Sequence, residues 1–134
     1  MRSRRLLTAV VTATALLGAV TACSSPDDPV QLVSVAEAPA VLDDPDVTVI
    51  DVRTPAEFAA GHLGDAVNID VDSGRFAEAI TALPADGDYL VYCQSGNRSG
   101  RATSQMAELG FTTVYDLDGG IAAWQAAGEP VVTD

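Results

Sequence analysis

The chain has 134 residues, 48% of them hydrophobic and 5% aromatic, which is enough for one compact domain with an aliphatic core and too few for two. Its formal net charge is −12, and all seven basic residues are arginines. Because so acidic a protein repels polyanions, we expect no nucleic acid among its partners. One histidine and two cysteines in unrelated segments offer no ligand set for a metal ion, and we expect neither a metal nor a cofactor.

The N-terminus carries the pattern of an export signal. Three arginines within the first few positions precede an apolar run over residues 6–20, which is short for a membrane span and leads through small residues to Cys23. This order resembles the lipobox of bacterial lipoproteins, in which the cysteine becomes the lipidated first residue. We therefore expect a signal peptide over residues 1–22 and an exported protein, held at the extracytoplasmic face of the cell membrane only by a lipid on Cys23. Ordinary cleavage that leaves Cys23 as a free thiol stays open, as does the choice between Sec and twin-arginine export.

The rest of the chain is expected to be a short tether followed by one domain. Residues 23–29 are polar and contain prolines, which is typical of a tether, and the domain is predicted over residues 30–134. Within it, short apolar runs alternate with helix-like segments. The predicted strands cover residues 47–52, 66–69, 89–92 and 113–117. This alternation indicates an α/β domain with a mainly parallel central sheet and helices on both faces.

Two helix starts can be predicted from their capping residues. Thr54 and Glu57 have the spacing of a capping box around a proline at the first helical position, so a helix should begin directly after Thr54. Ser34 and Glu37 have the same spacing. There, however, Pro39 falls where an amide hydrogen is needed, which predicts a later or irregular start.

The reactive chemistry is expected in the loop that follows the strand over residues 89–92. Cys93 directly follows this strand, and a helical pattern begins near Ser99. The expected buried face of that helix consists of Ala102, Met106 and Leu109. Ligands of open parallel sheets bind beyond the carboxyl ends of the strands, and free amides at a helix start favour anions. These amides, together with Arg98, should lower the pKa of Cys93 below its ordinary value of about 8.5 and favour the thiolate that a sulfur nucleophile requires.

Residues 93–99, with the sequence Cys-Gln-Ser-Gly-Asn-Arg-Ser, resemble the active-site loop of single-domain rhodaneses, whose pattern is Cys-x-x-Gly-x-Arg-Ser. Two further groups of segments agree with this family in the expected order. They are residues 51–58 with 61–63 and 66–69, and residues 117–124 with 128–131. Related folds that act on phosphate use a loop one residue longer, because it must enclose a tetrahedral oxyanion. The four residues between Cys93 and Arg98 therefore favour sulfur transfer over phosphatase or arsenate reductase chemistry.

The resemblance implies a rhodanese fold and a sulfurtransferase that works through a persulfide on Cys93. The outer sulfur would come from a small anionic donor such as thiosulfate and would pass to a thiol or to cyanide. Arg98 would bind the donor, while the loop amides would hold the sulfur and Gly96 would let the loop curl with a positive φ. The expected substrate-binding residues are Gln94, Ser95, Gly96, Asn97, Arg98 and Ser99.

Several other residues have a structural interpretation beside a functional one. Asp51 and Arg53 are candidates for a supporting role beside the site, although Arg53 could simply pair with Glu57 or Asp51. His62, the only histidine, is expected in a structural turn after a helix, and Trp124 in the core.

One alternative function belongs to a different class. The chain has no second nearby cysteine that could resolve a persulfide on Cys93. A non-catalytic persulfide carrier, or a redox-sensing module that docks to a partner, therefore stays open beside the enzyme. The sequence also leaves open the physiological donor and acceptor, the pathway served and the oligomeric state.

Overall fold

The computed structural model describes residues 27–133, so the expected signal peptide and Cys23 lie outside the described residues. Strands and helices alternate along the chain, as the sequence predicts. The elements are β1 (Val30–Val33), α1 (Ala38–Leu42), β2 (Val47–Asp51), α2 (Pro55–Ala60), β3 (Val67–Asn68), α3 (Phe76–Ile80), β4 (Asp88–Tyr92), α4 (Asn97–Glu108), β5 (Thr113–Leu117) and α5 (Gly120–Ala126). Within residues 27–133, no helix combines the length and the apolar character needed to cross a bilayer.

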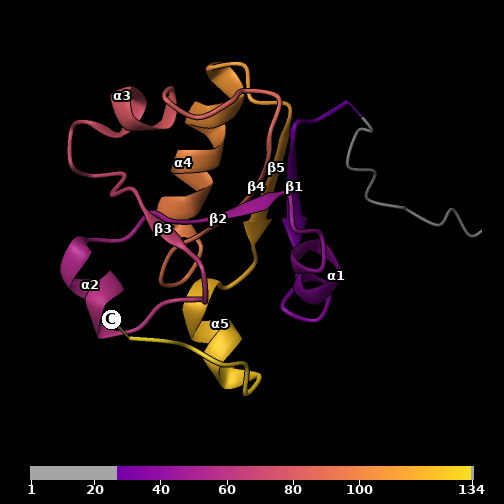
Figure 1. Cartoon of the computed structure of the whole chain (residues 1–134), viewed down its shortest axis with the longest axis vertical. Coiled ribbons are helices and arrows are strands. Elements are labelled where there is room, and N and C mark those ends of the chain that lie inside the picture. The colour runs from indigo at the N-terminus through magenta and orange to yellow at the C-terminus, as the bar shows by residue number, and fades with distance from the viewer. Residues whose placement is uncertain (1–26, 134) are drawn as a thin grey trace, which may run out of the picture.

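The strands form one sheet in the order β1-β5-β4-β2-β3, and every neighbouring pair is parallel (Figure 1). The predicted α/β class with a parallel central sheet is therefore confirmed. The predicted strands are present with slightly different ends, and β3 is shortened to Val67–Asn68. The edge strand β1 was not predicted, because it has only four residues and its middle two are exposed.

Helices cover both faces of the sheet, also as predicted. Successive side chains of a strand point to opposite faces, and the core is accordingly divided into two clusters. Ile50 and Val91 pack with residues of α3 and α4 on one face. Val49 and Leu90 pack with residues of α1 and α5 on the other. In Figure 1, α4 and α1 lie on opposite sides of the strands. Burial on both faces explains why β2 and β4 are almost continuously apolar.

The two predicted capping boxes have different outcomes. At α2 the box is complete, because Thr54 Oγ1 accepts from Glu57 N at 3.3 Å and Glu57 Oε2 accepts from Thr54 N at 3.1 Å. At α1, Ser34 N and Oγ donate to Glu37 Oε2 at 2.9 and 2.6 Å, but the helix begins only at Ala38. This matches the later start that the proline predicts.

The long helix α4 carries the loop on its N-terminal side. It begins at Asn97, earlier than predicted, and its side chains Ala102 and Met106 are fully buried as expected. The prediction for Leu109 is wrong, since this side chain is 41% exposed. The helix ends at Glu108, and Leu109 already belongs to the C-terminal cap, where the helical face no longer points into the core.

The start of α5 forms hydrogen bonds with the backbone of the first residues of the Cys93 loop. Ile121 N donates to the carbonyl oxygen of Cys93 at 2.9 Å, and Ala122 N donates to that of Gln94 at 3.1 Å. Gly120 has a φ of 61°, and a Cβ added there would collide with the Cys93 carbonyl oxygen. Glycine thus permits the close approach that fixes Cys93 at the carboxyl end of β4.

Candidate active site

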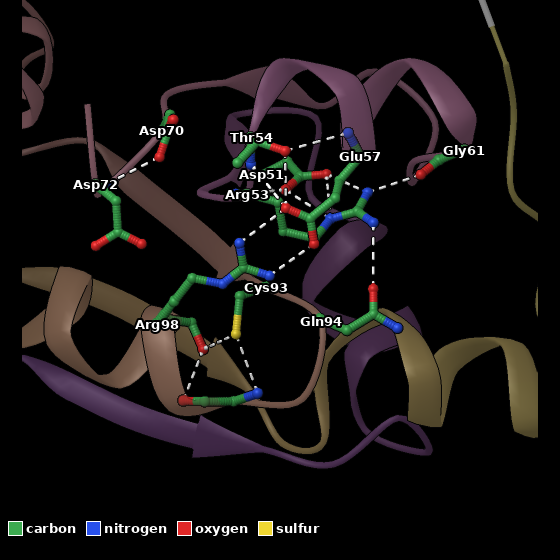
Figure 2. Close-up of polar contacts among 12 residues, drawn as sticks. Asp51, Arg53, Thr54, Glu57, Gly61, Asp70, Asp72, Cys93, Gln94 and Arg98 are labelled. Atoms are coloured by element: carbon green, nitrogen blue, oxygen red, sulfur yellow. Dashed lines mark hydrogen bonds and ion pairs between the residues drawn. The ribbon is translucent and has the colours of Figure 1, made fainter.

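Cys93 is only 1% exposed, and its sulfur points into the loop formed by residues 93–99 (Figure 2). The amide of Gly96 donates to Cys93 Sγ at 3.0 Å. The Ser99 hydroxyl lies 3.5 Å from Sγ, where it can accept from the thiol and donate to the thiolate. Gly96 has a φ of 107°, as its place in the loop predicts, and this left-handed conformation helps turn the amide toward the sulfur. The loop is therefore a cradle of hydrogen-bond donors around one sulfur atom.

The cradle favours the thiolate. Burial of the sulfur is the largest single influence and opposes ionisation, but hydrogen bonds outweigh it, and the pKa of Cys93 is lowered from its ordinary value. The Ser99 hydroxyl makes the largest lowering contribution, followed by the backbone amides of Ser99, Gly96 and Ser95. A buried sulfur with a lowered pKa is the state expected of a nucleophilic cysteine and not of an inert core cysteine.

The other predicted substrate-binding side chains of the loop do not surround the sulfur. Gln94, Ser95 and Asn97 are exposed, so their side chains are accessible from outside the loop. Gln94 Oε1 accepts from Arg53 Nη1 at 3.4 Å. The substrate-binding role of these three residues stays a prediction.

Arg98 is engaged in a two-pronged ion pair. Its Nη1 and Nη2 donate to Glu57 Oε2 and Oε1, each at 2.8 Å, and the pair joins the first turn of α4 to α2 (Figure 2). The hydrogen bonds from Arg98 are the largest influence on Glu57 and lower the pKa of that carboxyl to about 2. The sequence assigned Arg98 to an anionic donor and Glu57 to a possible pair with Arg53. The structure instead brings Arg98 and Glu57 together, and donor binding by Arg98 stays a prediction.

Arg53 and Asp51 form a buried cluster beside the loop. Arg53 is 4% exposed, and its Nη2 lies 2.6 Å from Asp51 Oδ2, so of the two expected partners the structure shows Asp51. The same nitrogen donates to the carbonyl oxygen of Gly61 at 2.7 Å, and the guanidinium lies 5.7 Å from the centroid of the Tyr92 ring. Through its contact with Gln94, Arg53 connects this cluster to the loop, and the supporting role of Asp51 and Arg53 stays a prediction.

His62 and Trp124 occupy the structural positions that the sequence predicts. His62 Nδ1 lies 2.9 Å from the carbonyl oxygen of Phe58, and the two rings stack with centroids 3.7 Å apart. These contacts place His62 in the turn after α2. Trp124 is 6% exposed, and its Nε1 donates to the carbonyl oxygen of Pro130 at 2.8 Å.

Asp116 is a buried acid near the site that the sequence analysis missed. It is 7% exposed, and its Oδ1 has no hydrogen-bond partner among the described residues. Burial is the largest influence on Asp116 and raises its pKa to about 6. The negative charge of Asp118 also raises this pKa, while a hydrogen bond from the Ser99 hydroxyl lowers it. Because Ser99 also contacts Cys93 Sγ, one hydroxyl links the two ionisable groups. The available signal was strand alternation, which puts Asp116 on the same face of β5 as the buried Val114.

Replacing Ser99 with alanine should raise the pKa of Cys93. A hydrogen bond to a charged group contributes about 1.5 to 3 kcal/mol, which corresponds to a pKa increase of roughly 1 to 2. The measurement is the thiolate absorbance at about 240 nm against pH, in protein that carries Cys23→Ser so that Cys93 is the sole thiol. Ser104→Ala is the matched control, since Ser104 lies on the same helix and donates to Gly100 O instead. An unchanged pKa in Ser99→Ala would show that the hydroxyl does not stabilise the thiolate.

Comparison with known proteins agrees with this geometry. The rhodanese-like domain family matches residues 34–127 of the chain. A sulfurtransferase of Allochromatium vinosum is 38% identical over 92 residues, which cover 69% of this chain and 84% of the relative. The thiosulfate sulfurtransferase GlpE of Pseudoalteromonas translucida is 33% identical over 95 residues, covering 71% of this chain and 89% of that protein.

Solved structures agree as well. A rhodanese-related protein of Thermoplasma volcanium superposes with a TM-score of 0.69 at 32% identity, and the match covers 78% of this chain and 99% of that one. The fold, the Cys93 loop and these relatives lead to one conclusion: the chain belongs to the rhodanese-like domain family and is a rhodanese-type sulfurtransferase.

Proposed function

We propose that the chain transfers sulfane sulfur through a persulfide on Cys93. The observation that carries the proposal is the buried sulfur with a lowered pKa, held by the Gly96 amide at 3.0 Å and the Ser99 hydroxyl at 3.5 Å. A thiolate in this position can attack the outer sulfur of a donor such as thiosulfate. A bond then forms between Cys93 Sγ and that sulfur, the S–S bond of thiosulfate breaks, and sulfite leaves with the electron pair.

The second half of the reaction returns the cysteine to its starting state. Cyanide or a thiolate attacks the outer sulfur of the persulfide, the bond to Cys93 Sγ breaks, and the thiolate is restored. In this step the negative charge develops on Cys93 Sγ, which is the atom that the loop donors already contact. The amides of Ser95, Gly96 and Ser99 can therefore stabilise the leaving thiolate without rearrangement, which is the advantage of preorganised donors.

The acceptor must come from outside the domain. Cys93 is the only cysteine within residues 27–133, so no second thiol in the described part of the chain can resolve the persulfide. This observation supports the second candidate function, a persulfide carrier or redox-sensing module that depends on a docking partner for turnover. The two functions differ in whether a small acceptor such as cyanide can remove the sulfur from Cys93 without a docking partner.

Purified protein supplied with thiosulfate and cyanide should form thiocyanate, and Cys93→Ser should abolish this activity because the attacking sulfur is lost. Thiocyanate formation can be followed by its iron complex, and intact-mass spectrometry should show one added sulfur atom after thiosulfate alone. Wild-type activity in Cys93→Ser would refute the mechanism. Stoichiometric loading without thiocyanate turnover would favour the carrier.

We further propose that the protein is exported and anchored by a lipid on Cys23. The support is the basic, apolar and small-residue order that precedes this cysteine in the sequence. Mass spectrometry of protein extracted from membranes of a bacterial expression host should then find an acyl-bearing residue 23 at the new N-terminus. A Cys23→Ser variant should lose both the acyl mass and the membrane fraction. Wild-type protein recovered without acyl groups and in the soluble fraction would refute the anchor.

A further inference from the structure

Every arginine within residues 27–133 already has a carboxylate partner. The chain contains no lysine, so these arginines are the only side chains in that region that carry a permanent positive charge. The pairs, with their shortest N–O distances, are Arg53 with Asp51 at 2.6 Å, Arg75 with Glu78 at 3.3 Å, Arg98 with Glu57 at 2.8 Å and Arg101 with Asp72 at 2.9 Å. An anionic molecule that approaches the loop therefore meets no uncompensated cation among the described residues.

The Arg98 pair matters most, because Arg98 belongs to the loop itself. A guanidinium binds a carboxylate or a sulfur oxyanion in the same two-pronged geometry. Here Glu57 uses both terminal nitrogens, at 2.8 Å each. Glu57 is held in turn by Thr54, whose amide and hydroxyl donate to Oε2 at 3.1 and 2.8 Å. The carboxylate is thus fixed in the place that an anionic donor would need.

We propose that Glu57 selects the sulfur donor by its charge. With Arg98 neutralised, the site should disfavour a dianion such as thiosulfate and prefer a sulfane sulfur carried by an organic group with at most one negative charge, as in a thiosulfonate or an organic persulfide. The inference rests on the proposed persulfide function of Cys93 and adds the class of donor. Glu57 is a specificity-determining residue in this account, because it acts on the donor through Arg98 and does not touch the reacting sulfur.

The pair should persist over the useful pH range. With a pKa of about 2, Glu57 stays ionised in any ordinary assay buffer. Its pKa is lowered in the folded protein, so the stabilising effect of the pair is present above pH 4.5 and is lost only as the pH falls toward 2. Glu57 itself therefore keeps its charge, and its pair with Arg98, between pH 6 and 9.

Methanethiosulfonate and thiosulfate make a matched pair of probes, because they transfer the same atom and differ in charge. The Cys93 thiolate attacks the sulfane sulfur of methanethiosulfonate, a new S–S bond forms, the old S–S bond breaks, and methanesulfinate leaves with the electron pair. Neither donor requires an oxidant or a proton. Dividing each loading rate by the rate with free cysteine thiolate removes the difference in intrinsic reactivity.

The test compares the normalised loading rates of Cys93 in wild-type protein and in Glu57→Gln, all in protein carrying Cys23→Ser. Glutamine at this position can keep the capping box of α2 while removing the charge. Wild type should prefer methanethiosulfonate over thiosulfate by about tenfold or more, and Glu57→Gln should reduce that preference by about tenfold, because like-charge repulsion is removed and Arg98 is released. Glu78→Gln is the control, since it removes the same charge from an exposed pair and should leave the preference unchanged.

The outcomes separate the inference from the function beneath it. A merely structural role for Glu57 would change both donors by the same factor, and an unchanged preference in Glu57→Gln would overturn the inference while persulfide formation stands. If Glu57→Gln does not fold, the normalised loading rates of the wild-type protein still test the inference. Equal rates for the two donors would contradict selection by charge. If wild-type Cys93 is loaded by neither donor, the proposed function fails and the inference fails with it.

Discussion

The site depends on a loop that lowers the pKa of one buried sulfur and so favours its anionic form. Burying a charge is costly unless hydrogen bonds replace the lost water, and at Cys93 the replacement comes from the Gly96 amide, the Ser99 hydroxyl and the neighbouring loop amides. The surrounding fold keeps those donors in place. The carboxyl end of β4 presents the cysteine, the start of α4 presents the amides, and α5 fixes the first two loop carbonyls through its own first turn.

This arrangement explains how a strongly acidic protein can lower the pKa of a buried cysteine. The two arginines near the loop each form an ion pair, Arg98 with Glu57 and Arg53 with Asp51. The sulfur is stabilised by backbone amides and one hydroxyl, which act at short range, and Arg98 adds an attraction between its charge and Cys93. We propose that the response to the charge of the donor is set by the Arg98 and Glu57 pair.

Much of this could be predicted from the sequence because the signals are local. The strand, loop and helix around Cys93 are adjacent in the chain, and the capping box at Thr54 depends only on residues within one helical turn. What could not be predicted depends on contacts between distant segments. Glu57 and Arg98 are 41 residues apart, and nothing local tells which of two arginines the glutamate will bind. The exposed edge strand β1 gives too weak an apolar pattern, and Leu109 continues the helical period past the point where the helix ends.

The central claim is that the loop lowers the pKa of Cys93 in spite of its burial, and direct titration tests it. In protein carrying Cys23→Ser, Cys93 is the only thiol, and its thiolate absorbance can be followed against pH without interference from another cysteine. The account predicts a midpoint clearly below the ordinary cysteine value of about 8.5, matched by the midpoint for alkylation by iodoacetamide. A midpoint at or above that value would mean that burial outweighs the hydrogen bonds and would contradict the account.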